Sequence, residues 1–399
     1  MPPLWTSAFR PFYLLGALYG LLLMLAWLGV HAGLWTSPSP LPLKLWHGHE
    51  FIFGFSAAII TGIVLTALPS WAGTDEIHGA PLAVLVALWL AGRIAPWLSP
   101  WLSSALIGAI DCALFPAVAL LVAPQLLRAR NRLYLLLLPI LAGLFAANGL
   151  FHAGIGAGNE ALAHLGLRLA LYAIMVLYVL KGGVLTPIFT GNALREKGRG
   201  GQAPFRMSLE AAAVSAVLLL AALDLAGAPA PWTGAAALAC AVLNGVRTAR
   251  WKGWRIADVP LVFVMHLGFA WLVFAFALKA AAGLAGLVPE AAWVHAFTVG
   301  SLGLMMLGLM TRVTLRHTGR PLDVPRAMRA AYATMFAAAL IRLTATVHGL
   351  GNGAVALAAV LWAAPFAIYL ALFAGALLRP SLPRKQGNTP ADAACQETE

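Results

Sequence analysis

The chain has 399 residues, of which 61% are hydrophobic and only 10% are charged, and its formal net charge is +12. Its mean hydropathy of +0.85 excludes a water-soluble surface and indicates a membrane protein with several spans. The basic residues fall in short segments between apolar runs, with no long basic tract. We therefore interpret the positive charge as a topology signal, and we expect no nucleic-acid partner.

Twelve apolar runs follow one another along the chain. Each is close to the roughly 20 residues that a membrane helix needs, and each is continuous instead of alternating with polar residues. The runs lie near residues 11–33, 46–69, 80–98, 103–123, 133–155, 161–188, 208–226, 231–248, 259–284, 290–311, 327–349 and 353–378. We predict an all-α, polytopic membrane protein with one twelve-helix domain over residues 1–379 and a polar, disordered tail over residues 380–399.

Lysine and arginine concentrate in alternate loops. With the N-terminus inside, the inner segments hold most of them, and the outer loops hold only Lys44 and Lys279. This asymmetry predicts that both termini are cytoplasmic. The cysteines, Cys112, Cys240 and Cys395, are far apart, which excludes a disulfide framework and a clustered thiolate site. A bound metal would therefore need nitrogen and oxygen ligands.

Several histidines lie near the outer ends of the predicted helices. His47 and His49 open the second helix, His152 closes the fifth, and His295 lies early in the tenth, whereas His266 lies nearer the inner side of the ninth. Imidazole is the common protein ligand for haem iron, copper and zinc. Because carboxylates are few and thiolates are not clustered, haem or copper is favoured. Any one of these histidines, taken alone, is more often an interfacial, hydrogen-bonded residue.

The spacing of the histidine pair constrains its ligands. Residues i and i+2 on a helix point about 200° apart, so His47 and His49 cannot reach one metal from the same helical face. Either they serve two sites, or His47 lies in the first turn. Glu50 is an acceptor for an imidazole N–H, a carboxylate favoured by the helix dipole, or a proton relay. Asn148, one turn before His152, is expected to orient that ring.

Other charged residues fall within the apolar runs. Arg93, Arg168 and Arg342 lie near the outer ends of their predicted helices, at the depth of haem propionates. Snorkelling to the interface explains Arg93 equally well. Asp111, midway through the fourth run, is a candidate proton-relay carboxylate, or it bonds a neighbouring helix.

A weak internal repeat links two of the runs. The pattern His49-x-Phe51-x-x-Gly54 resembles His295-x-Phe297-x-x-Gly300, and the next helix carries Arg93 in one case and Arg342 in the other. Chance is the alternative explanation in a glycine-rich chain. A true repeat would place His49 and His295 at equivalent depth on two helices that run in the same direction.

Short motifs spread over nearly the whole chain carry a family resemblance. They are Trp46-His47-Gly48-His49-Glu50, Leu68-Pro69-Ser70-Trp71-Ala72-Gly73, Leu90-Ala91-Gly92-Arg93, Asn148 with His152, Lys181-Gly182-Gly183 to Thr190-Gly191-Asn192, Met265-His266-Leu267-Gly268, and His295-Ala296-Phe297-Thr298-Val299-Gly300 running to Arg312 and His317-Thr318-Gly319-Arg320. Together they resemble the NnrS family of bacterial inner-membrane proteins tied to nitric oxide stress. One departure is Val184, where the family usually has an arginine after the glycine pair.

The resemblance implies a multi-pass inner-membrane protein with haem and copper that protects cells against nitric oxide. It carries the family's histidines onto His47, His49, His152, His266 and His295. Haem-copper oxidases offer an architectural analogy, since they also place haem-ligating histidines on the second and tenth of twelve helices, but their copper-site motifs are missing from this sequence.

Our hypothesis is a b-type haem between the second and tenth helices, with His49 and His295 as axial ligands. Copper or a second haem would bind some of His47, His152 and His266. Nitric oxide or another small diatomic ligand would arrive through the lipid bilayer, and the sequence identifies no electron donor. Binding and enzymatic reduction of nitric oxide both stay open. The alternative is a transporter or channel in which the histidines form a proton or metal-ion path.

Overall fold

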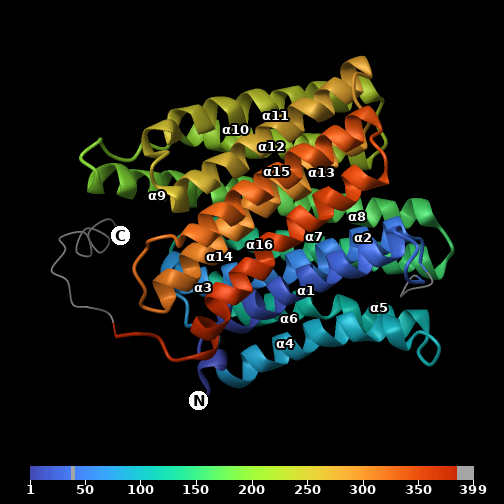
Figure 1. Cartoon of the computed structure of the whole chain (residues 1–399), viewed down its shortest axis with the longest axis horizontal. Coiled ribbons are helices and arrows are strands. Elements are labelled where there is room, and N and C mark those ends of the chain that lie inside the picture. The colour runs from blue at the N-terminus through green and yellow to red at the C-terminus, as the bar shows by residue number, and fades with distance from the viewer. Residues whose placement is uncertain (37–40, 384–399) are drawn as a thin grey trace.

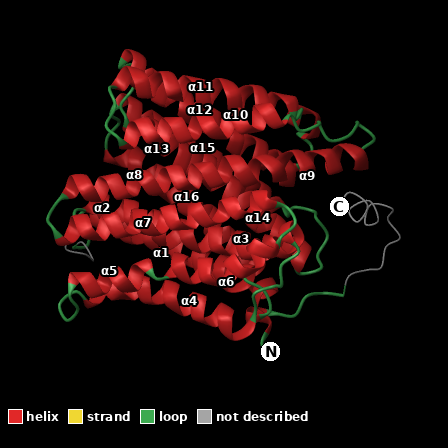
Figure 2. Cartoon of the chain, turned by 180° about the vertical axis from the view of Figure 1, so that it is seen from behind, coloured by secondary structure: helices red, strands yellow, loops and turns green. Residues whose placement is uncertain are grey.

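The computed structural model describes residues 1–36 and 41–383, and every regular element in these ranges is helical (Figure 1, Figure 2). The long helices run side by side along the long axis of the molecule. The N-terminus and the last described residues lie at one end, where Arg10 donates to the carbonyls of Leu377 at 2.8 Å and Arg379 at 2.7 Å. This end is called the termini end. Residues 384–399 of the predicted tail lie outside the described residues.

Eleven helices in the described ranges are long and apolar enough to cross a membrane. The protein is therefore an all-α, polytopic membrane protein, as the apolar runs predict. Helix α11 is a twelfth long helix and packs against α10 and α12. The helices are α1 (Phe9–His31), α2 (Leu43–His49), α3 (Ala57–Ala72), α4 (Gly79–Ile94), α5 (Ser104–Cys112), α6 (Leu114–Arg128), α7 (Leu137–Gly156), α8 (Glu160–Leu177), α9 (Gly183–Glu196), α10 (Met207–Leu225), α11 (Ala230–Arg250), α12 (Pro260–Ala285), α13 (Ala291–His295), α14 (Gly303–His317), α15 (Arg326–His348) and α16 (Asn352–Leu378).

The sixth span is longer than its apolar run. The run was predicted to end at residue 188, but α9 continues to Glu196. Ala193 and Leu194 extend the apolar face and are buried against Ile256 and Val262. The stabilisation from burying these two side chains is larger than the cost of including the polar residues around them, and the helix therefore continues.

Three spans form the centre of the bundle. In Leu43–Ser70, Ala291–His317 and Glu160–Glu196, 89%, 83% and 67% of the most apolar window is buried, the highest shares among the spans. Each of the three contains a π-helical stretch: η2 (Glu50–Ser56), η7 (Ala296–Leu302) and η5 (Tyr178–Gly182). They are the second, tenth and sixth long helices, so central helices recur at every fourth position. The weak internal repeat around His49 and His295 therefore has a structural counterpart, because a π-helical stretch follows each histidine directly.

The central helices contact one another and are held by side chains at their π-helical stretches. Trp89 Nε1 of α4 donates to the carbonyl of Gly54 in η2 at 2.9 Å. The hydroxyl of Tyr178 in η5 donates to the carbonyl of Ser301 in η7 at 3.5 Å. Helix α8 contacts α2 and η2, and α14 contacts α3. A π-helical stretch leaves backbone carbonyls displaced from the regular ladder, and such side-chain donors satisfy them.

Each central helix is also paired with the next helix by a polar contact. The three pairs are Glu50 with Arg93 of α4, Arg168 with Asp224 of α10 at 3.6 Å, and His295 with Arg342 of α15 at 2.8 Å. Buried charges in a membrane require such partners. The candidate site residues therefore lie where a central helix contacts the helix that follows it in the chain.

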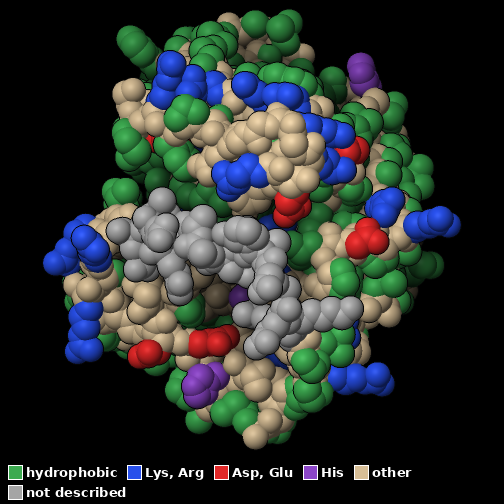
Figure 3. Space-filling view, turned by 90° about the vertical axis from the view of Figure 1, so that its left-hand side faces the viewer, with side chains coloured by type: hydrophobic (Ala, Val, Ile, Leu, Met, Phe, Trp, Pro, Cys, Tyr) green, Lys and Arg blue, Asp and Glu red, His purple; other side chains and the backbone are tan. Residues whose placement is uncertain are grey.

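Lys and Arg side chains gather on the termini end (Figure 3). One basic residue departs from the predicted topology: Lys279 was expected in an outer loop, but it lies within α12 and is only 3% exposed. Its ammonium pairs with Asp224 at 2.8 Å and Glu290 at 2.7 Å, and lies 4.6 Å from the centre of the Trp293 ring. These contacts offset the desolvation of the charge, so the residue is tolerated inside the helix.

Helices α7 and α8 pack closely at Gly166. A Cβ atom at this position would lie 2.5 Å from the carbonyl oxygen of Ala147 and 2.7 Å from the amide nitrogen of Phe151. Gly166→Ala should therefore lower the free energy of unfolding by about 1–3 kcal/mol, because backbone has to move. Gly143→Ala on the same interface is the matched control, since its Cβ would meet Ala173 Cβ at an ordinary 3.8 Å. Denaturant titration in detergent checks this, and equal stabilities would contradict it.

Candidate metal centre

The second span brings two candidate residues into the centre of the bundle. His49 ends α2 and Glu50 begins η2, and both side chains are buried. His49 Nδ1 donates to Glu50 Oε1 at 3.1 Å. The ring of His49 also stacks on Phe151, with ring centres 4.2 Å apart. These contacts fix the ring orientation and direct Nε2 towards α5 and α7.

Asp111 of α5 is the hub of the site. Its Oδ2 lies 3.0 Å from His49 Nε2 and 2.8 Å from His152 Nε2. Asn148 Nδ2 donates to the same oxygen at 3.1 Å, and Asn148 Oδ1 lies 3.0 Å from His49 Nε2. Asn148 was expected to orient His152, but its contacts are with Asp111 and His49. The α5–α6 junction places Asp111 at the end of a helical segment, facing α7.

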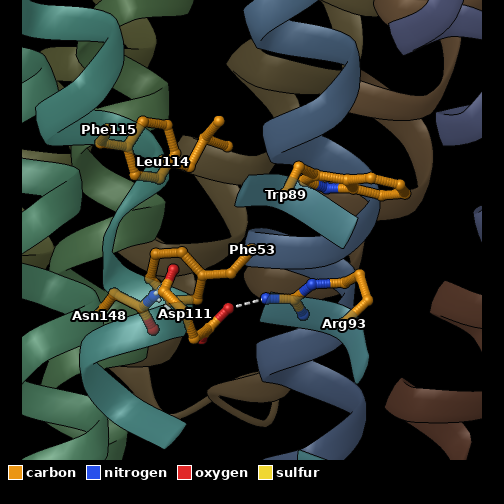
Figure 4. A pocket seen from close by; sticks show the side chains of 7 residues that line it. All are labelled: Phe53, Trp89, Arg93, Asp111, Leu114, Phe115 and Asn148. Carbon is orange, nitrogen blue, oxygen red and sulfur yellow. Dashed lines mark hydrogen bonds and ion pairs between the residues drawn. The ribbon is translucent and has the colours of Figure 1, made fainter. Parts of the chain in front are cut away.

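Arg93 connects the two buried carboxylates. One nitrogen of its guanidinium donates to Glu50 and another to Asp111, as Figure 4 shows for Asp111. The hydroxyl of Tyr19 in α1 donates to the same oxygen of Glu50 as Arg93. Tyr19 was not among the predicted site residues, because nothing in the apolar run distinguishes it from Tyr13.

A metal ion fits the donors of this site. Ligand atoms of His49, Asp111 and His152 all lie within 4.8 Å of one another, and His49 and Asp111 are buried. Two imidazole nitrogens and one carboxylate oxygen suit copper, iron or zinc better than calcium or magnesium. Glu50 and Asp111 carry two negative charges against the single positive charge of Arg93. A metal cation or a bound proton would compensate the remaining charge in the low-dielectric interior.

A small cavity adjoins the site beside Asp111 (Figure 4). Its volume is about 10 Å³, and its walls include Phe53, Trp89, Leu114 and Phe115. This is roughly the room that one water molecule occupies. The site therefore has space for a ligand of very few atoms, on a side that is mostly apolar.

His47 and His295 belong to a different neighbourhood. The ring centre of His47 lies 5.5 Å from that of Trp27, and His47 Nδ1 is buried with no hydrogen-bond partner among the described residues. His295 Nδ1 donates to the carbonyl of Ala291 at 2.8 Å, and its Nε2 accepts from Arg342 at 2.8 Å. His47, His295 and Arg342 are close enough to interact electrostatically.

The structure thus separates the histidine pair as helical geometry requires. His47 is the fifth residue of α2, past the first turn of about 3.6 residues, so the alternative that it lies in the first turn is wrong. His49 meets Asp111 and His152, whereas His47 lies within electrostatic range of His295 and Arg342.

Two further predicted residues lie elsewhere. His266 Nε2 is 2.7 Å from the Thr190 hydroxyl, and no described histidine or carboxylate completes a ligand group around it. The side chain of Arg168 is 47% exposed, and its contact with Asp224 places it in the network of Lys279. The structure therefore brings neither residue to the His49 group.

Comparison with known protein families shows to which family the chain belongs. The profile of the family described as "NnrS protein" matches residues 3–381, from before α1 to beyond α16. The chain belongs to the NnrS family. This family is linked to the nitric oxide response, and the match covers all residues of the His49 group. The comparison with curated proteins gives no match.

Proposed function

We propose that this NnrS-family protein protects cells by binding nitric oxide at a metal centre within the membrane and reducing it to nitrous oxide. The observation that carries the proposal is the convergence of the buried His49 and Asp111 with the partly buried His152. Nitric oxide is small and apolar enough to arrive through lipid. The basic side chains on the termini end support a multi-pass protein of the bacterial inner membrane, one helical domain over residues 1–379, with both termini cytoplasmic.

Copper is the metal that we assign to the His49 group. Both imidazole rings present Nε2 to Asp111 Oδ2, so the three ligand atoms already converge. Glu50 accepts from His49 Nδ1, which fixes the ring as carboxylate partners of ligating histidines do. Bound copper would supply an open coordination position for nitric oxide.

Haem is assigned to the neighbourhood of His295. Nδ1 of this ring donates to a backbone carbonyl, so Nε2 carries the lone pair, which accepts from Arg342 in this structure. Haem binding would require that guanidinium to turn from His295 Nε2 to a propionate, for which it is a suitable cation. The buried, unpartnered Nδ1 of His47 offers a second ligand there. The pairing of His49 with His295 stays a prediction, but the neighbours of the two rings favour His47 as the partner.

The protein's carboxylates have a role in proton supply. Reduction of two nitric oxide molecules to nitrous oxide and water consumes two electrons and two protons. Glu50 accepts from the Tyr19 hydroxyl and Arg93, and Asp111 lies beside the cavity. The position of Glu50 suits a carboxylate that holds and passes protons at Oε2, whereas Asp111 Oδ2 would be occupied by copper. The surrounding aromatic side chains exclude bulk water.

The histidine assignments can be tested by spectroscopy and metal analysis. Purified protein from haem-replete cells should show a Soret band and contain copper. His295→Ala and His47→Ala should lose the Soret band and keep copper, whereas His49→Ala and His152→Ala should lose copper. His31→Ala is the control that should keep both. Wild-type protein with neither cofactor would refute the proposal. Loss of the Soret band in both His49→Ala and His295→Ala, with the band retained in His47→Ala, would restore the axial pairing predicted from the sequence.

The alternative of a transporter or channel rests on the same buried charges. Glu50, Arg93 and Asp111 could form part of a proton path without any metal. Proton flux into vesicles that contain metal-free protein, abolished by Asp111→Asn, would favour this alternative.

A further inference from the structure

A groove runs along the surface of the bundle between α5 and α7 and ends at the candidate metal centre. Its volume is about 580 Å³, and glycine and alanine make up most of its lining. The other lining residues are Ser104, Cys112, Phe145 and His152. Both helices belong to predicted membrane spans, and Phe145 is exposed. The groove therefore faces the region where lipid would surround the protein.

His152 connects this groove to the metal group. Its Nε2 contacts Asp111 at 2.8 Å, while the other edge of the ring faces Gly108, which also lines the groove. A Cβ on Gly108 would lie 3.5 Å from His152 Nδ1. Nδ1 has no hydrogen-bond partner within the described ranges of the chain. One imidazole thus separates the groove from Asp111.

Size and polarity restrict what the groove binds. It is far larger than a diatomic gas requires, and it falls within the roughly 300–1,000 Å³ range of small-molecule sites. Most of its wall is apolar, but the Ser104 hydroxyl and the His152 imidazole offer hydrogen bonds. A ligand with an apolar tail and a hydroxylated ring matches this distribution and can reach the groove through lipid.

We propose that the groove binds a quinol, which supplies the electrons and protons for nitric oxide reduction. The balance is one quinol plus two nitric oxide molecules giving one quinone, one nitrous oxide and one water. The two electrons and two protons that leave the quinol hydroxyls are those that the reduction consumes. His152 positions the ring through Nδ1 and lies between the quinol and Asp111. The redox role rests on the proposed function, whereas quinone binding does not.

Binding is tested on full-length protein freed of metal by chelation, with decylubiquinone as the probe. A Cβ atom added at Gly149 meets nothing within 4 Å, and Gly149 lines the groove, so the ring of Gly149→Phe should extend into the groove. We expect it to weaken binding by about tenfold or more. Ala153→Phe, at a second exposed lining position, should do the same. Gly375→Phe on α16, where an added Cβ atom also meets nothing within 4 Å, is the matched control and should bind like the wild type.

Other ligands of the groove, or binding of the quinone elsewhere, would give different results in these experiments. Equal competition by decanol would identify a groove for acyl chains and overturn the proposal, as would unchanged binding in both groove variants. An azido-substituted decylquinone should label peptides of α5 and α7, and labelling confined to other helices would also overturn it. In metal-loaded protein, one quinol should be oxidised for every two nitric oxide molecules consumed. Quinone binding in protein that never takes up metal would reject the proposed function while leaving the binding site intact.

Discussion

Replacing Arg93 by methionine should lower the free energy of unfolding by about 3–5 kcal/mol, because the substitution leaves two buried carboxylates without their cation. Arg93 donates to both Glu50 and Asp111, and all three side chains are buried. Methionine keeps most of the apolar stem, so the loss reports the uncompensated charge more than a cavity. Denaturant titration of purified protein in detergent, without added metal, measures the effect.

Arg168→Met is the matched control for this substitution. Arg168 also lies on a long helix and faces a carboxylate, but its side chain is 47% exposed and its ion pair with Asp224 is 3.6 Å long. An exposed pair of this kind contributes about 0–1 kcal/mol. If the two variants lost equal stability, the charge cluster around Arg93 would not be the stabilising element inferred from the structure.

Asp111→Asn should weaken copper binding by about 100-fold or more, since even partners of ligating residues change metal affinity by about 10–100-fold. The substitution removes the ligand oxygen's negative charge but keeps one oxygen that can accept from Arg93 in the place of Oδ1, and its amide group can donate to His152 Nε2 in the place of Oδ2. The folded structure should therefore survive. Equilibrium dialysis of chelated protein against a copper buffer measures the affinity.

His266→Ala provides the control for metal binding. His266 is one of the predicted ligands, but its Nε2 contacts the Thr190 hydroxyl at 2.7 Å, apart from the His49 group. We expect its copper affinity to equal that of the wild type. Wild-type affinity in Asp111→Asn, or loss of affinity in His266→Ala, would show that the metal lies elsewhere.

The fold could be predicted from the sequence because membrane spans follow from apolar length alone. All predicted runs correspond to long helices, including the less apolar α11. The errors occur where tertiary contacts decide the outcome. Burial of Leu194 extends α9 beyond its run, and two carboxylates hold Lys279 inside α12. Neither partner set is close in sequence, so spacing could not show it.

The sequence indicated which residues belong to the candidate site, but not which of them lie together. Glu50, Asp111 and Arg93 stood out because charges are rare in apolar runs, and the 200° separation correctly divided the histidine pair. Which helices face each ring depends on helix rotation and packing, which a single sequence does not reveal. His49 was therefore paired with His295, although its hydrogen bonds lead to Asp111.

The π-helical stretches have a consequence for the ancestry of the chain. The second, sixth and tenth long helices each contain an irregular turn and carry a polar pair to the following helix. Triplication of a four-helix gene segment would produce this arrangement. The three pairs differ in chemistry: the first joins a carboxylate to an arginine, the second reverses that order along the chain, and the third has an imidazole in place of the acid. The metal group has no counterpart in the middle segment, so specialisation of the outer two would account for the separate histidine neighbourhoods.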